Sequence, residues 1–209
     1  MKHPRFLIIV MLAAALAMLI GSGKGRALAY PEPAIVASSW SLAFTLAEPA
    51  TIAVPDVHGS TRWYWYVAYQ VANHSGDDRR FIPEFTIATD RGHIISAGRK
   101  VPGAVFRAIK AELKNPLLES PIQIVGKILQ GEDFAKEGVA IWPVPDQDVD
   151  EFSLFVSGLS GETATIRNPL TGDEVLMRRT LMLTYATPGN NPNPQDQSVI
   201  LTARREVMR

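Results

Sequence analysis

Apolar and polar residues alternate with a period of two along most of the chain, and this alternation predicts β-strands. The clearest run covers residues 63–72, where tryptophan and valine occupy one face while Tyr64, Tyr66 and Gln70 occupy the other. Aromatic and β-branched side chains suit the pleated surface of a strand. We therefore expect the tryptophan face to be core and the tyrosine face to be only partly covered.

Other alternating runs predict further strands, at 35–46, 81–89, 93–96, 139–142, 152–156, 162–167 and 174–186. Turn signals rich in glycine, proline, asparagine or aspartate separate them, as at 158–161 and 168–173, and Pro49 and Pro55 bound a predicted loop. Short strands with frequent turns favour an antiparallel β-sandwich.

The apolar spacing changes once, between residues 102 and 130. Val105, Ile109 and Leu113 recur every four positions after Pro102, which predicts an amphipathic helix that ends near Asn115. Helices in this place have two interpretations, because they either pack on the sandwich or protrude as a hairpin that docks a partner.

Ser120 and Gln123 resemble a capping box, which favours a second short helix through Leu129. The isoleucine and valine content of 122–129 keeps a strand open as the alternative. Taken together, the patterns predict a mainly β fold, an antiparallel sandwich with a two-helix insertion at about residues 102–130.

The first 29 residues have the order of a secretory signal peptide. Lys2 and Arg5 precede a 15-residue apolar run at 6–20, and a small-x-small pattern ends at Ala29. A helix of that run spans about 22 Å, less than the ~30 Å of a hydrocarbon core. We expect cleavage, export to the periplasm, cell envelope or medium, and no membrane span afterwards; an uncleaved anchor is the alternative.

The expected mature chain divides into a domain at 30–187 and a flexible C-terminal segment at 188–209. The turn-rich stretch 188–194 supports this boundary, and 198–209 is expected as a tail or a weakly attached strand. A domain of this size buries a substantial core.

The amino-acid composition excludes several classes of functional site. The chain has no cysteine, which excludes disulfides, thiolate metal sites and a cysteine nucleophile. After residues 1–29 it carries 17 Lys and Arg against 21 Asp and Glu, a net charge of −4. A mildly acidic protein lacks the cations that phosphate backbones require, so we expect no nucleic-acid partner.

One stretch carries a resemblance to known proteins: Tyr69-x-Val71-x-Asn73-x-Ser75-Gly76, followed by Phe81, Phe85 and Asp90-Arg91-Gly92. It resembles exported bacterial immunoglobulin-like domains, and the mature chain as a whole is similar to an uncharacterised family of exported bacterial proteins. The resemblance implies an immunoglobulin-like sandwich, an exported location and a turn held by the Asn73 side chain. It implies no catalytic residue.

The strongest candidate binding residues are aromatic. Tyr64, Tyr66 and Phe106 offer a flat platform for a sugar ring or a peptide if their face is open, and belong to the core if it is covered. On this basis the expected partner is a protein or a glycan of the cell envelope, bound without a cofactor.

Asp146, Asp148 and Asp150 alternate in a way that suits a hard cation such as calcium. The EF-hand pattern is not met, because Glu151 stands where it needs glycine and Ser157 where it needs glutamate. We therefore interpret the run as an acidic loop that enters a strand, and as a weak candidate only.

Two functions from different classes remain. The first is a non-enzymatic exported module used for binding or envelope assembly. The second is a periplasmic hydrolase or metal-dependent enzyme whose site is assembled from distant loops, with His58, His93, Asp56 and the acidic run as contributors. Histidines and a carboxylate that converge in a cleft would favour the second.

Overall fold

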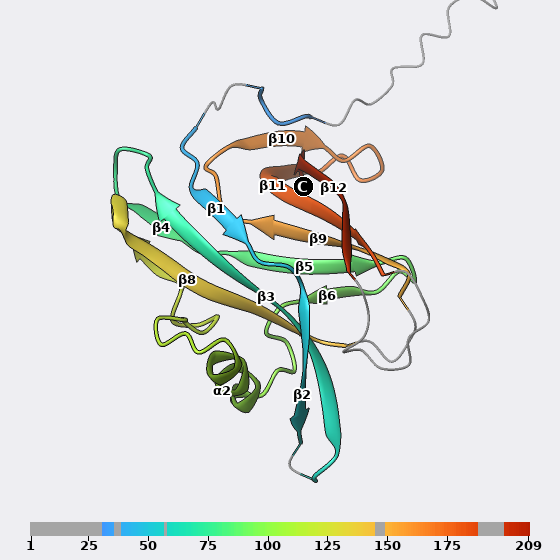
Figure 1. The fold of residues 1–209 in the computed structure, drawn as a ribbon. Helices are drawn as coiled ribbons and strands as arrows, with labels where there is room; N and C mark the ends of the chain where they lie inside the picture. Colours follow the sequence, from blue (N-terminus) through green and yellow to red (C-terminus); the bar gives the residue numbers. More distant parts are fainter. Residues whose placement is uncertain (1–30, 36–38, 57, 145–148, 188–198) are drawn as a thin grey trace, which may run out of the picture. The chain divides into compact units, whose positions relative to one another are not determined.

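Antiparallel β-sheets dominate the structure. The computed structural model describes residues 31–35, 39–56, 58–144, 149–187 and 199–209, so the predicted signal peptide at 1–29 lies outside the described residues. Within these ranges the elements are β1 (Ala43–Leu46), β2 (Ala50–Pro55), β3 (Thr61–Asn73), β4 (Arg79–Phe81), β5 (Glu84–Thr89), β6 (Ile94–Ser96), α2 (Gly103–Glu112), β7 (Gly126–Ile128), β8 (Gly131–Pro143), β9 (Glu151–Ser157), β10 (Thr163–Arg167), β11 (Glu174–Ala186) and β12 (Ile200–Met208) (Figure 1). The mainly β, antiparallel class expected from the alternation is confirmed.

Strand β3 lies at the centre of a four-stranded sheet. It pairs with β8 along one edge and with β2 and then β1 along the other, all antiparallel. The loop predicted between Pro49 and Pro55 is therefore wrong, because these residues form β2. Pro49 lacks an N–H and only interrupts the ladder, which resumes where Ala50 pairs with Tyr66.

Strand β11 organises the six-stranded sheet, whose order is β10-β11-β9-β5-β6 with β12 also paired to β11. β9 and β10 follow one another along one edge of β11, separated by the turn at 158–162, and β12 takes the other edge. Residues 200–208, expected as a tail or a weakly attached strand within the C-terminal segment, form β12, so the strand alternative is confirmed. The N–H and C=O groups along the second edge of β11 form the hydrogen bonds to this strand. Nearly all β12 side chains are exposed, so the strand has little apolar alternation to reveal it.

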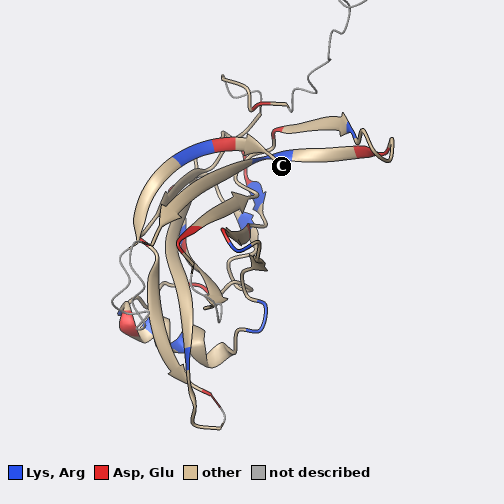
Figure 2. Cartoon of the chain, turned by 90° about the vertical axis from the view of Figure 1, so that its right-hand side faces the viewer, with Lys and Arg blue, Asp and Glu red and all other residues tan. Residues whose placement is uncertain are grey.

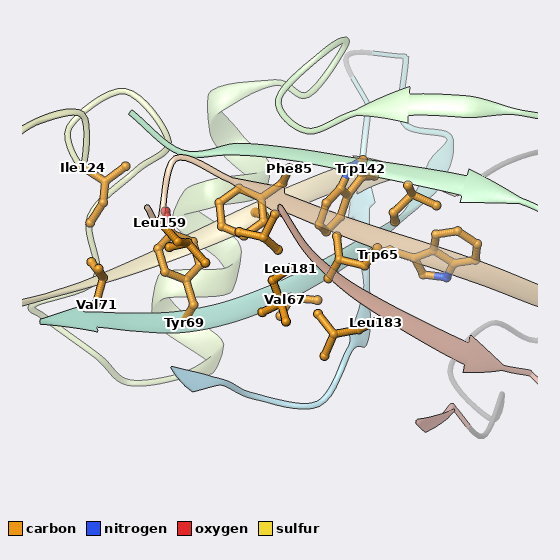
Figure 3. Packing of buried hydrophobic residues seen from close by; sticks show 14 of the residues in the cluster. Trp65, Val67, Tyr69, Val71, Phe85, Ile124, Trp142, Leu159, Leu181 and Leu183 are labelled. Atoms are coloured by element: carbon orange, nitrogen blue, oxygen red, sulfur yellow. The ribbon is translucent and has the colours of Figure 1, made fainter. Parts of the chain in front are cut away.

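The main core lies between the two larger sheets. Aromatic rings from both meet there: Trp65 stacks on Phe152 with ring centroids 5.2 Å apart, and Tyr69 contacts Phe85 at 4.8 Å. Trp142 of β8 is fully buried and meets Phe85 edge-on. Figure 3 shows Trp65, Tyr69, Phe85 and Trp142 pointing into the same space. The tryptophan face of β3 is thus core, as its period-two pattern predicted.

Helix α2 covers the opposite face of the four-stranded sheet. Val105 and Ile109, which define its apolar stripe, are buried in a second cluster with Tyr64 and Tyr66 of β3. The first predicted helix is therefore confirmed, and it packs on the sheet rather than protruding. In the described part of the chain no helix is long and apolar enough to cross a membrane.

The second predicted helix is wrong, and the described residues contain one helix in the insertion instead of two. Both capping-box hydrogen bonds form: the Ser120 N–H donates to Gln123 Oε1 at 3.0 Å, and the Gln123 N–H donates to Ser120 Oγ at 3.3 Å. They open a single turn only. The chain then forms β7, which pairs with β4, so the strand kept open as the alternative for 122–129 is confirmed for residues 126–128. Ile124 in the turn and Ile128 in β7 are both buried in the main core.

Asn73 holds the turn after β3, as the resemblance to immunoglobulin-like domains implied. Its buried side-chain amide donates to the backbone oxygens of Asp77 at 2.8 Å and Ile128 at 3.1 Å. Its Oδ1 accepts from the backbone N–H of Ser75. A buried amide with these partners fixes the turn and ties it to β7.

Candidate binding site

The aromatic platform predicted from the sequence is not open. Tyr64 is 4% exposed and Tyr66 is 7% exposed, because α2 packs over them. Phe106 lies half-buried on α2, with the Lys110 ammonium 5.9 Å from its ring centroid. The tyrosines therefore belong to the fold, and the interpretation as a ligand platform is corrected.

The acidic run gains no support as a metal site. Asp146 and Asp148 lie outside the described residues, while Asp150 is exposed and lies 3.4 Å from the Arg91 guanidinium. Across the described ranges, no three histidine or carboxylate side chains gather in a way that suits a metal ion.

The histidines lie on separate turns. His58 precedes β3 and His74 follows it, and a strand of 13 residues spans about 40 Å at ~3.3 Å per residue. His74 Nε2 lies 2.9 Å from Glu132, and His93 is exposed in the turn between β5 and β6. Of the groups considered for a loop-assembled enzyme site, Asp56 lies beside His58, whose backbone N–H donates to Asp56 Oδ1 at 2.9 Å. His93 lies between β5 and β6, and Asp150 precedes β9.

The outward face of the six-stranded sheet is a further candidate surface. The strand registers place Thr86, Phe155, Met182 and Arg205 in one row across β5, β9, β11 and β12. None of these side chains belongs to either hydrophobic cluster. Among the described elements, α2 covers the other sheet, and none packs over this face.

The outward face contains a hollow of about 430 Å³, which we call the Phe155 hollow. Its lining residues are Glu84, Thr86, Phe155, Ser157, Leu176, Arg178, Thr180 and Arg209. Leu176 comes from the β10–β11 hairpin, which extends beyond the neighbouring strands (Figure 2). The volume lies in the range of pockets that bind small molecules.

Two arginines stand side by side in this hollow. The backbones of Arg178 and Arg209 exchange both hydrogen bonds, at 2.7 and 3.0 Å, so their side chains share one face. The Arg209 guanidinium lies 4.3 Å from the centroid of the Phe155 ring, which holds it over the sheet. In Figure 2 the end of the chain lies beside this basic part of β11.

This pair has no described ion-pair partner. In the described parts of the chain, neither Arg178 nor Arg209 has a carboxylate within the 4.0 Å of an ion pair. Like charges that face each other across two strands destabilise a sheet. An anion bound between the guanidinium groups would relieve this repulsion.

The neighbouring arginine shows the contrast. Arg179 points to the other side of β11, where its Nη1 donates to Glu162 Oε2 at 2.8 Å and its Nη2 binds Glu206. The Ala34 N–H donates to Glu162 Oε1 at 2.7 Å; this bond and the guanidinium hold the pKa of Glu162 below its usual value. Arg179 thus forms ion pairs with two carboxylates, whereas among the described residues none is within ion-pair distance of Arg178.

The Glu162 cluster leads to a pH-dependent prediction. Because the folded-state pKa is lowered, Glu162 contributes stability above its ordinary pKa of 4.5 and loses it as the pH falls through the lowered value. We expect Glu162→Gln to reduce the free energy of unfolding at pH 7 and to converge with wild type in acid. Urea titrations at both pH values check this. Glu174→Gln, at an exposed site, is the control, and a constant gap down to pH 3 would contradict the assignment.

Sequence patterns missed the hollow for a simple reason. Arg178 stands in a predicted strand, whereas Arg209 stands in a segment expected as a tail or a weakly attached strand with no predicted partner, so nothing in the sequence places the two together. The pairing of β12 with β11 does so. In comparisons with known proteins, no family model, curated protein or solved structure matches this chain.

Proposed function

We propose that this chain is an exported, non-enzymatic binding module of the immunoglobulin-like sandwich type, and that it takes an anionic ligand into the Phe155 hollow. The signal-like pattern of residues 1–29 supports export to the periplasm or cell envelope. Two sheets that meet through a shared aromatic core support the sandwich. The adjacent arginines Arg178 and Arg209, for which no ion pair is described, carry the proposal for the ligand.

The chemistry of guanidinium explains why the ligand is anionic. Each Arg presents a planar fork of N–H donors that matches the two oxygens of a carboxylate. Hydrogen bonds that involve a charged group contribute about 1.5–3 kcal/mol each. An anion between Arg178 and Arg209 also removes their mutual repulsion, so binding and relief of strain act in the same direction.

Sodium malonate at constant ionic strength is the probe for this proposal. The chain is produced from its full coding sequence and recovered from the periplasmic fraction, so its recovery there also tests export. We expect malonate to raise the Tm, because a ligand of the folded state stabilises it. Arg178→Glu is expected to remove the malonate-dependent rise, and to raise ligand-free stability by roughly 0.2–1 kcal/mol by pairing with Arg209.

Arg204→Glu is the matched control. It makes the same charge change on the neighbouring strand β12. Arg204 pairs with Leu183, on the face of the sheet opposite to the one that carries Met182 and Arg205. Differential scanning calorimetry of wild type, Arg178→Glu and Arg204→Glu, with and without malonate, measures the change in Tm. If Arg178→Glu and Arg204→Glu keep the same malonate response as wild type, the Phe155 hollow is not the anion site.

A further inference from the structure

The Phe155 hollow contains more than positive charge. Glu84 places a carboxylate in the same lining, and Thr86 and Ser157 bring hydroxyl-bearing side chains to it; Thr180 also borders the hollow but is only 3% exposed. Ser157 Oγ donates to Glu84 Oε2 at 3.5 Å, and Thr180 Oγ1 donates to the backbone oxygen of Arg178 at 3.0 Å. The hollow therefore offers strong donors and strong acceptors together.

This mixture discriminates between kinds of anion. Sulfate is a dianion with acceptor oxygens only, so it satisfies the arginines but meets stronger repulsion from Glu84 than a single carboxylate does. A zwitterion such as glycine pairs its carboxylate with an arginine and its ammonium with Glu84, and it then has no hydroxyl groups of its own for the Ser and Thr side chains. A carboxylate that also carries hydroxyl groups has partners for the arginines, for Glu84 and for the Ser and Thr side chains.

On the basis of the proposed function, we infer that the ligand of the Phe155 hollow is an acidic sugar, a uronic acid unit of a glycan. Its carboxylate binds the guanidinium groups of Arg178 and Arg209, and a ring hydroxyl donates to Glu84. Other ring hydroxyls exchange hydrogen bonds with the Ser and Thr side chains that line the hollow.

Two apolar residues complete the site. Leu176 is 57% exposed on the β10–β11 hairpin and supplies an apolar surface for the C–H face of the ring. Phe155 has a different role, because the Arg209 guanidinium already lies over its ring. Phe155 is thus a positioning residue that orients Arg209 toward the carboxylate.

Titration calorimetry with sodium D-glucuronate, methyl glucoside, sodium sulfate and glycine tests the inference on the full chain recovered from the periplasm. We expect glucuronate to bind most tightly and the neutral glucoside to bind at least tenfold more weakly. Glu84→Gln is the decisive variant. It is expected to lower the affinity for glucuronate about tenfold, because a hydrogen bond to a charged group is lost. It is expected to raise the affinity for sulfate, because the repulsion from the carboxylate is removed. Glu151→Gln, at an exposed glutamate of β9 outside the hollow, is the control.

The outcomes separate the inference from the proposed function. If sulfate binds in an Arg178-dependent way and glucuronate is no tighter, the acidic-sugar inference is overturned while the anion site stands. Tighter binding of glycine than of glucuronate also overturns the sugar class. If no anion binds with dependence on Arg178, both proposals fail. Opposite effects of Glu84→Gln on glucuronate and sulfate support the inference.

Discussion

Replacing Trp142 with alanine is expected to lower the free energy of unfolding by about 3–5 kcal/mol, the usual cost of truncating a large aromatic side chain in a core. Trp142 is 0% exposed and stands opposite Trp65 across the β3–β8 pair. Its ring also meets Phe85 of the other sheet. The substitution opens a cavity where the two sheets touch, and the rings around it cannot collapse far because their strands are hydrogen-bonded in place.

Phe134→Ala supplies the control for this prediction. Phe134 belongs to the same strand as Trp142 but is 49% exposed, so its truncation should cost about 1 kcal/mol or less. Urea denaturation followed by tryptophan fluorescence and by far-ultraviolet circular dichroism measures both variants. Equal losses for the two substitutions would show that the space between the sheets is not the principal core.

Gly158→Ala is expected to cost roughly 2–5 kcal/mol, from two causes that act together. Gly158 has φ +87°, and the left-handed region costs a residue with a Cβ about 1–2 kcal/mol. An added Cβ would also stand 2.3 Å from the backbone oxygen of Ile82, a clash with main chain that no rotamer change relieves. Forcing a methyl group into such a space typically costs a further 1–3 kcal/mol.

Gly172→Ala separates the two causes. Gly172 has a similar φ of +78°, but an added Cβ there would meet no atom within 4 Å. The control should therefore lose only about 1–2 kcal/mol. Thermal and urea unfolding of both variants give the comparison. If Gly172→Ala proves as damaging as Gly158→Ala, the close approach of the 158–162 turn to Ile82 contributes nothing.

The turn at 158–162 connects β9 to β10, and its backbone is hydrogen-bonded to the segment that precedes β1. The Leu42 N–H donates to Leu159 O at 2.8 Å, and the Gly161 N–H donates to Trp40 O at 3.1 Å. A Cβ at Gly161 would meet the Trp40 indole. Gly158 thus allows the close approach of the Ile82 main chain, and Gly161 allows the close approach of the Trp40 side chain.

The local alternation of side chains determined most of the strands. In β3, β5, β9 and β11 successive residues point to opposite faces, so burial of one face leaves a period-two pattern that can be read directly. The helix at Gly103–Glu112 is equally local, because Val105 and Ile109 lie one turn apart on one face. The turn at Asn73 depends on a side chain and a backbone a few positions away.

Only the tertiary structure decided which faces are covered and which strands adjoin. The tyrosines of β3 became core because α2 packs on them, and residues 126–128 became a strand because β4 offers them an edge. The pairing of β12 with β11 brought Arg178 and Arg209 together. Periodicity records how one segment distributes its own side chains, whereas contacts between distant segments depend on the path of the whole chain, and the Phe155 hollow exists only through such contacts.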